Sequence, residues 1–134
     1  TPTLAGIEAQ GMTLEITLPW PPTVNTYYRN VGGVMKISEK GRSYSKAVAD
    51  QVLIQRAAKQ FTGRLYVRIV AWPPDTRKRD LDNLFKSVLD SLTKAGVWLD
   101  DSQIDELSIY RGNIGGMVRV EVRELSACAL RRQL

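Results

Sequence analysis

The chain has 134 residues, 43% of them hydrophobic and 25% charged, which is an ordinary composition for one globular domain with a buried core. It contains no His and only one Cys, so an internal disulfide bond and a Cys/His zinc site are excluded, and any hydrolytic chemistry must use carboxylates, Lys, hydroxyl groups or a bound metal ion. The net charge of +5 favours a polyanionic partner such as nucleic acid, although a basic protein without such a partner would have the same charge.

We expect one domain, spanning residues 12–124. Residues 1–11 are small, polar and without a pattern, so we treat them as an N-terminal extension or a remnant of expression, and residues 125–134 as a mixed C-terminal tail. No internal repeat, low-complexity segment or linker interrupts the sequence. No stretch is apolar over the roughly 20 residues that a membrane-spanning helix needs, and no signal-peptide pattern opens the chain. We therefore expect no membrane partner and a cytoplasmic location.

The first predicted strand covers residues 13–18, where apolar and polar side chains alternate as they do in a half-buried strand. After a proline-rich segment, residues 25–29 are predicted to form a loop. Tyr27, Tyr28 and Arg29 in this loop are candidates for contact with DNA. For the two tyrosines, packing at the edge of the core is an equally good interpretation, and the sequence does not decide between them.

A pair of glycines then predicts a turn into a short strand at residues 34–37, which carries Lys36, a further candidate for contact with DNA. Ser38 suits the N-cap of a helix predicted over residues 39–60, whose apolar spacing indicates a scaffold role. The strongest strand pattern follows at residues 64–72. Hydrophobic side chains occupy both of its faces, so we expect both faces to be largely covered.

The most informative segment is a basic run that leads directly into two acidic residues. Arg77, Lys78 and Arg79 precede Asp80 and Asp82, and the two carboxylates open a helical pattern. The cations are suited to phosphates, and clustered carboxylates are suited to a hard divalent ion such as Mg²⁺. A segment that has both predicts metal-assisted attack on a phosphodiester.

The helix that follows is strongly amphipathic. Asp80 occupies the expected N-cap position, and Asp82, Lys86 and Asp90 share the polar face at intervals of four. A structural interpretation exists for each: Asp80 could cap the helix, and Asp82 and Lys86 could form a surface ion pair. For Asp90 we expect no role beyond the solvated face. The apolar stripe consists of Leu81, Leu84, Phe85, Val88, Leu89 and Leu92.

A second acidic pair, Asp100 and Asp101, follows this helix after an apolar tripeptide. The pair could be only a turn or a cap, and its value for metal binding depends on the chain folding back towards Asp80. Two final strands are predicted around residues 107–109 and 118–122, with a glycine pair between them that suggests a hairpin. These elements predict an α/β (α+β) domain with a mixed sheet of about four to five strands and two main helices.

Three segments in this order match a known family, and their combined spacing is specific. They are Leu18-Pro19-Trp20-Pro21-Pro22 with Asn25 and Tyr27-Tyr28-Arg29, then Arg79-Asp80-Leu81-Asp82-Asn83 with Lys86, then Leu92-Thr93-Lys94-Ala95-Gly96-Val97-Trp98-Leu99-Asp100-Asp101. With them, the chain resembles the RusA-type Holliday junction resolvases, small endodeoxyribonucleases of phages and prophages, from Met12 to about Glu124.

The resemblance implies a homodimer that binds four-way junction DNA and cuts two opposing strands during recombination and repair. It implies Mg²⁺ as the cofactor, with Mn²⁺ as an alternative. The metal-binding and catalytic carboxylates would be Asp80, Asp82 and Asp101, and the catalytic lysine would be Lys86.

The remaining site residues are expected around this centre. Asp100 and Asn83 would lie beside the ligands and support them. The surface that contacts DNA would consist of Arg77, Lys78, Arg79, Tyr27, Tyr28, Arg29 and Lys36.

Two other classes of protein stay open. The chain could be a metal-dependent nuclease that acts on flaps or other branched DNA, which nothing in the sequence excludes. It could also be a basic junction-binding module without catalysis. The joint presence of Asp80, Asp82, Lys86 and Asp101 argues against the second class.

Overall fold

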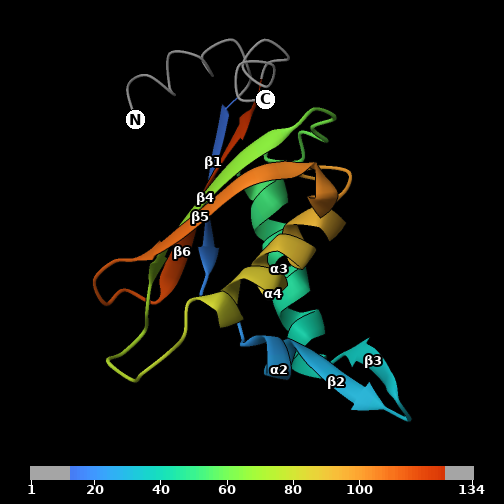
Figure 1. The fold of residues 1–134 in the computed structure, drawn as a ribbon, viewed down its shortest axis with the longest axis vertical. Coiled ribbons are helices and arrows are strands. Elements are labelled where there is room, and N and C mark those ends of the chain that lie inside the picture. Colours follow the sequence, from blue (N-terminus) through green and yellow to red (C-terminus); the bar gives the residue numbers. More distant parts are fainter. Residues whose placement is uncertain (1–12, 126–134) are drawn as a thin grey trace.

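A computed structural model describes residues 13–125, which form an α+β domain on a four-stranded mixed sheet (Figure 1). The extension predicted at residues 1–11 lies outside the described residues, as does the predicted tail from residue 126 onward. The strands lie in the order β1, β6, β4, β5, with β6 antiparallel to both of its neighbours and β4 parallel to β5. Their bounds are β1 (Thr13–Pro19), β4 (Leu65–Trp72), β5 (Ile104–Arg111) and β6 (Met117–Glu124).

The core lies between this sheet and two helices, α3 (Glu39–Ile54) and α4 (Asp82–Lys94), which cover one face of the sheet (Figure 1). Alternation along β4 explains the arrangement, because every second side chain points at the helices. On the other face Val70 is also buried, at 3% exposure, so both faces of β4 are largely covered as predicted. The helices contribute Tyr44, Val48, Val52, Leu84, Val88, Leu89 and Leu92 to the core.

The first helix begins as predicted but ends earlier. Ser38 is its N-cap and accepts a hydrogen bond from the N–H of Gly41 at 2.9 Å. The prediction that the helix reaches residue 60 is wrong, because α3 ends at Ile54 and Arg56 takes a left-handed backbone conformation with φ of 55°. Ala57, which falls inside the predicted helix, is fully buried but lies beyond the end of α3.

The hairpin predicted between the last two strands is absent, since β4 lies between β5 and β6 in the sheet. The connection crosses the end of β4, where a Cβ on Gly112 would lie only 2.5 Å from ring atoms of Trp72. Glycine at position 112 therefore lets the backbone pass close to Trp72. Gly116, with φ of 82°, forms a turn in a left-handed conformation that glycine adopts easily.

The loop predicted at residues 25–29 is also wrong. The segment forms a short helix, α2 (Val24–Tyr27), and then enters a separate antiparallel hairpin of β2 (Tyr28–Val31) and β3 (Val34–Ile37). The β3 strand and the turn before it were predicted. This β2–β3 hairpin projects from the body of the domain, at the end away from the start of β1 (Figure 1). Among residues 13–125, no helix combines the length and apolar character needed to cross a bilayer.

Candidate active site

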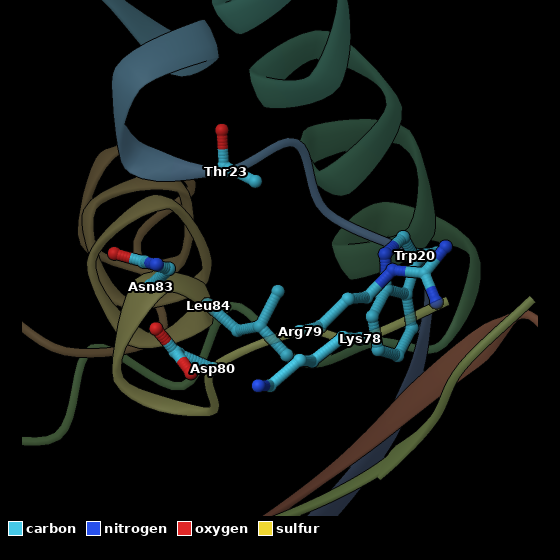
Figure 2. Close-up of a pocket in the computed structure, with 7 residues that line it drawn as sticks. All are labelled: Trp20, Thr23, Lys78, Arg79, Asp80, Asn83 and Leu84. Atoms are coloured by element: carbon cyan, nitrogen blue, oxygen red, sulfur yellow. The ribbon is translucent and has the colours of Figure 1, made fainter. Parts of the chain in front are cut away.

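The start of α4 presents two exposed carboxylates, Asp80 and Asp82. Asp80 is not the N-cap that the sequence predicted: the N-cap position belongs to Leu81, whose side chain makes no capping hydrogen bond. Among residues 13–125 neither carboxylate has an ion-pair partner, so both charges are available to a ligand. Asp80 shares the lining of a pocket with Lys78 and Asn83 (Figure 2).

The basic run before these carboxylates is organised by Asp75. Its carboxylate pairs with Arg77 at 3.1 Å and with Arg79 at 2.8 Å. Hydrogen bonds from the side chain and N–H of Arg77, and then from Arg79, hold the pKa of Asp75 well below its usual range. Lys78 is exposed and has no ion pair within the described part of the chain.

Arg79 contributes to the fold of this loop. Its side chain is only 17% exposed, and its Nη1 donates to the carbonyl oxygens of Asp75 and Arg77 at 3.2 Å. The guanidinium also lies 5.7 Å from the ring centroid of Trp20. Nη1 and Nη2 of Arg79 are therefore used inside the loop, and contact of Arg79 with DNA stays a prediction.

The polar face of α4 is arranged around Asp90. Lys86 Nζ lies 3.7 Å from Asp90 Oδ2, and the hydroxyl of Tyr28 donates to the same carboxylate oxygen. Burial raises the pKa of Asp90, and the charge of Asp101 raises it further, against the opposing effect of Lys94. The prediction that Asp90 belongs to the solvated face is wrong, and the ion pair of Lys86 is with Asp90 and not with Asp82.

The second acidic pair divides into two roles. Asp100 is the N-cap of the 3₁₀ helix η1 (Asp101–Gln103), in a reciprocal capping box with Gln103. The backbone N–H of Ser102 is the main cause that lowers the pKa of Asp100. The structure thus gives Asp100 the capping role that the sequence left open, while Asp101 stays exposed.

The carboxylates predicted to bind metal do not all meet in one chain. Asp101 is close enough to Asp90 for its charge to act there, and Asp90 lies two turns, about 12 Å along the helix, beyond Asp82. Within residues 13–125 no group of three His, Cys, Asp or Glu side chains is placed to hold a metal ion. Asp80, Asp82 and Asp101 therefore do not form such a group within the described part of one chain.

The residues predicted to contact DNA in the β2–β3 hairpin and directly before it also divide. Tyr27 is completely buried, with its hydroxyl near Ser45 at 3.3 Å and Ser91 at 3.2 Å, so packing is the correct interpretation and contact with DNA is not. Arg29 and Lys36 are exposed and stand directly opposite each other in the hairpin register. Like charges in this position destabilise a strand pair, and a bound phosphate would offset that cost.

Comparison with known proteins gives a consistent result. Residues 19–123 match the family model described as endodeoxyribonuclease RusA. The chain is 41% identical over 116 residues to the crossover junction endodeoxyribonuclease rusA of Enterobacteria phage HK97, covering 84% of this chain and 96% of the relative. It is 38% identical over 115 residues to the protein of that name in Escherichia coli strain K12, and 39% identical to that of Enterobacteria phage 82, with the same coverage.

Proposed function

The chain belongs to the RusA family of endodeoxyribonucleases, and we propose that it resolves four-way DNA junctions by paired phosphodiester cuts in opposing strands. The observation that carries the proposal is the start of α4, where Asp80 and Asp82 are exposed without ion-pair partners in the described chain and Lys86 follows one turn later. The three relatives described above, which come from two phages and Escherichia coli, are named crossover junction endodeoxyribonucleases. We place the reaction in the cytoplasm, where such DNA recombines.

A divalent ion is part of this proposal. Asp80, Asp82 and Asp101 would hold Mg²⁺, or Mn²⁺ in its place, and Asn83 and Asp100 would support them. The donor chemistry fits a hard cation, because the chain offers carboxylate oxygens and has no His. When bound, the ion would lower the pKa of a water molecule and polarise the phosphate.

The side chains of the protein would supply the other requirements. The side chain of Lys86 is 61% exposed, so its ammonium group can reach the phosphate and stabilise charge that develops on it. Lys78, Arg29 and Lys36 are exposed and would bind backbone phosphates on either side. Arg77 is also exposed at 81%, but its pairing with Asp75 competes with a phosphate.

A homodimer is the second part of the proposal. Two related cuts in a junction with approximate two-fold symmetry require two related sites, and a C₂ dimer supplies them. It would present a formal charge of 2 × (+5) = +10 to the DNA. Because the described part of one chain does not gather three carboxylates, we expect metal binding to depend on dimer formation, so that dilution below the dimer dissociation constant should also release Mg²⁺.

Cleavage of a substrate panel tests the proposal. Four-way junctions, flaps, forks and linear duplexes are incubated with the protein in Mg²⁺, and in EDTA as the control. Symmetric cuts in the junction alone, lost in EDTA, are the expected result. Preference for flaps would identify the alternative nuclease, and tight junction binding without any cutting would identify a binding module.

A further inference from the structure

Asp90 is an unusual residue for the polar face of a helix. Its side chain is only 18% exposed, and two polar groups contact it from different elements. Lys86 lies on the preceding turn of α4, and the hydroxyl of Tyr28 comes from β2, while Asp101 and Lys94 act on it through their charges. The proposed chemistry of the site makes no use of this carboxylate.

Lys86 is held from two sides at this position. Its Nζ lies 3.7 Å from Asp90 Oδ2 and 5.8 Å from the ring centroid of Tyr28. A lysine side chain on a helix surface has several rotamers of similar energy, and exposed ion pairs alone order it weakly. The carboxylate and the aromatic ring together restrict where the ammonium group can lie.

The contact also joins the catalytic helix to the root of the β2–β3 hairpin. The rings of Tyr27 and Tyr28 pack edge to face with centroids 4.7 Å apart, and the hydroxyl of Tyr27 reaches Ser91 of α4. A two-stranded sheet is only marginally stable alone, so these root contacts fix where the hairpin lies. Its exposed cations, Arg29 and Lys36, therefore stand on an element whose base touches Lys86 through Tyr28.

We propose that Asp90 and Tyr28 form a clasp that positions Lys86 for catalysis and couples it to the DNA contacts of the β2–β3 hairpin. The inference rests on the proposed nuclease function of the same site. Asp90 is a positioning residue in this account, since it acts through Lys86 and does not touch the DNA. The clasp predicts a loss of cleavage rate with little loss of affinity.

Single substitutions with a matched control test the clasp. Asp90→Asn removes the charge that holds Lys86, and Tyr28→Phe removes one hydroxyl. Asp50→Asn is the control, because Lys46 and Asp50 form the same i,i+4 pair on α3 at 3.4 Å, with side chains that are 79% and 54% exposed. Single-turnover cleavage at saturating enzyme, the dissociation constant for a junction without Mg²⁺, and amide hydrogen exchange of residues 28–37 in the free protein are measured for each.

We expect Asp90→Asn to slow cleavage by about 10- to 100-fold, the range typical of groups that orient a reactive side chain, with the dissociation constant within about threefold of wild type. Tyr28→Phe should slow cleavage less, and both variants should speed exchange in the hairpin. The control, Asp50→Asn, should change neither the cleavage rate nor the hydrogen exchange of the hairpin.

Several results would overturn the clasp. Asp90→Asn with a wild-type rate and unchanged exchange would do so, and so would a loss of activity that merely tracks a lower folded fraction. If Asp90→Asn does not fold, Tyr28→Phe decides, because it removes only a hydroxyl. If the wild-type protein cuts no DNA at all, the proposed function fails. Hydrogen exchange in the free protein still tests whether Asp90 and Tyr28 fix the position of the hairpin.

Discussion

Lys86 Nζ lies 3.7 Å from Asp90 Oδ2, one turn further along α4, while Asp82 on the preceding turn keeps its carboxylate free of ion pairs within the described chain. The polar face of α4 thus carries an unpaired negative charge at Asp82, near the start of the helix. Further along, the charges of Lys86 and Asp90 partly neutralise each other. The negative end is suited to a cation, and the ammonium group beside it is suited to a phosphate. This division makes the two residues separable by mutation.

Asp82→Asn should abolish cutting and leave junction binding intact. The substitution removes a proposed metal ligand, so we expect the single-turnover rate to fall by at least about 100-fold, more than is usual for a group outside the coordination sphere. It also removes a negative charge, which cannot weaken attraction to DNA. Cleavage and gel-shift assays measure the two effects. Asp50→Asn, the same change at another exposed helix position, is the control, and cutting at a near wild-type rate would remove Asp82 from the catalytic set.

Lys86→Ala should lose cleavage far more than stability. The ion pair with Asp90 is partly exposed, and such i,i+4 pairs contribute only about 0.5 kcal/mol. Alanine is also the best helix former, so α4 should persist. Thermal melting and the cleavage rate per folded molecule are compared. A large drop in melting temperature with an unchanged rate would assign Lys86 a structural role.

Lys78→Ala and Arg79→Ala should affect different properties, although the residues are neighbours. Lys78 is exposed, so its loss should flatten the slope of log affinity against log salt by about one unit for each chain engaged, with no change in melting temperature. Arg79 is bonded within its loop, so its loss should lower the melting temperature and leave the salt slope nearly unchanged. The reverse result would show that Arg79 is the residue that reaches phosphates.

Tyr44→Phe should remove part of the alkaline sensitivity of the fold. Burial raises the pKa of Tyr44 well above 10, and its hydroxyl donates to the carbonyl oxygen of Pro19 at 2.9 Å. Above pH 10 the unfolded chain loses this proton while the folded chain keeps it, so the free energy of unfolding falls by up to about 1.4 kcal/mol per pH unit.

Urea unfolding at pH 7 and pH 11 checks this prediction. At pH 7 the variant should be less stable by about 1–2 kcal/mol, because the carbonyl of Pro19 loses its donor. The difference between the two proteins should narrow at pH 11. An equal difference at both pH values would mean that Tyr44 does not titrate differently in the folded and unfolded states.

Local patterns in the sequence predicted most elements of the fold. Alternation identified β1 and β4, and the apolar stripe identified α4, because each of these signals depends on residues close in the chain. The predicted final hairpin failed because it depended on a distant contact. The order β1, β6, β4, β5 separates β5 from β6 although a short glycine-containing connection joins them, since β4 competes for both.

The same reason explains what was missed at the candidate site. Lys86 has an aspartate four residues away on either side, so spacing alone cannot decide which one pairs with it. The structure shows the pair with Asp90, whose carboxylate also accepts a hydrogen bond from Tyr28. Tyr28 is 62 residues away in the sequence, so local spacing could not reveal this contact. The capping role of Asp100, in contrast, was within reach of the sequence, because Gln103 follows three residues later in the capping-box pattern.

The position of β1 has a consequence for synthesis of the protein. Among residues 13–125 its only neighbour in the sheet is β6, with Thr13 opposite Arg123 and Pro19 opposite Met117. During translation, β1 emerges from the ribosome early, but its partner is among the last described segments to be made. Ile16 and Leu18 therefore cannot pair with β6 until almost the whole domain has been synthesised. We expect the addition of β1 to the sheet to be a late step of folding.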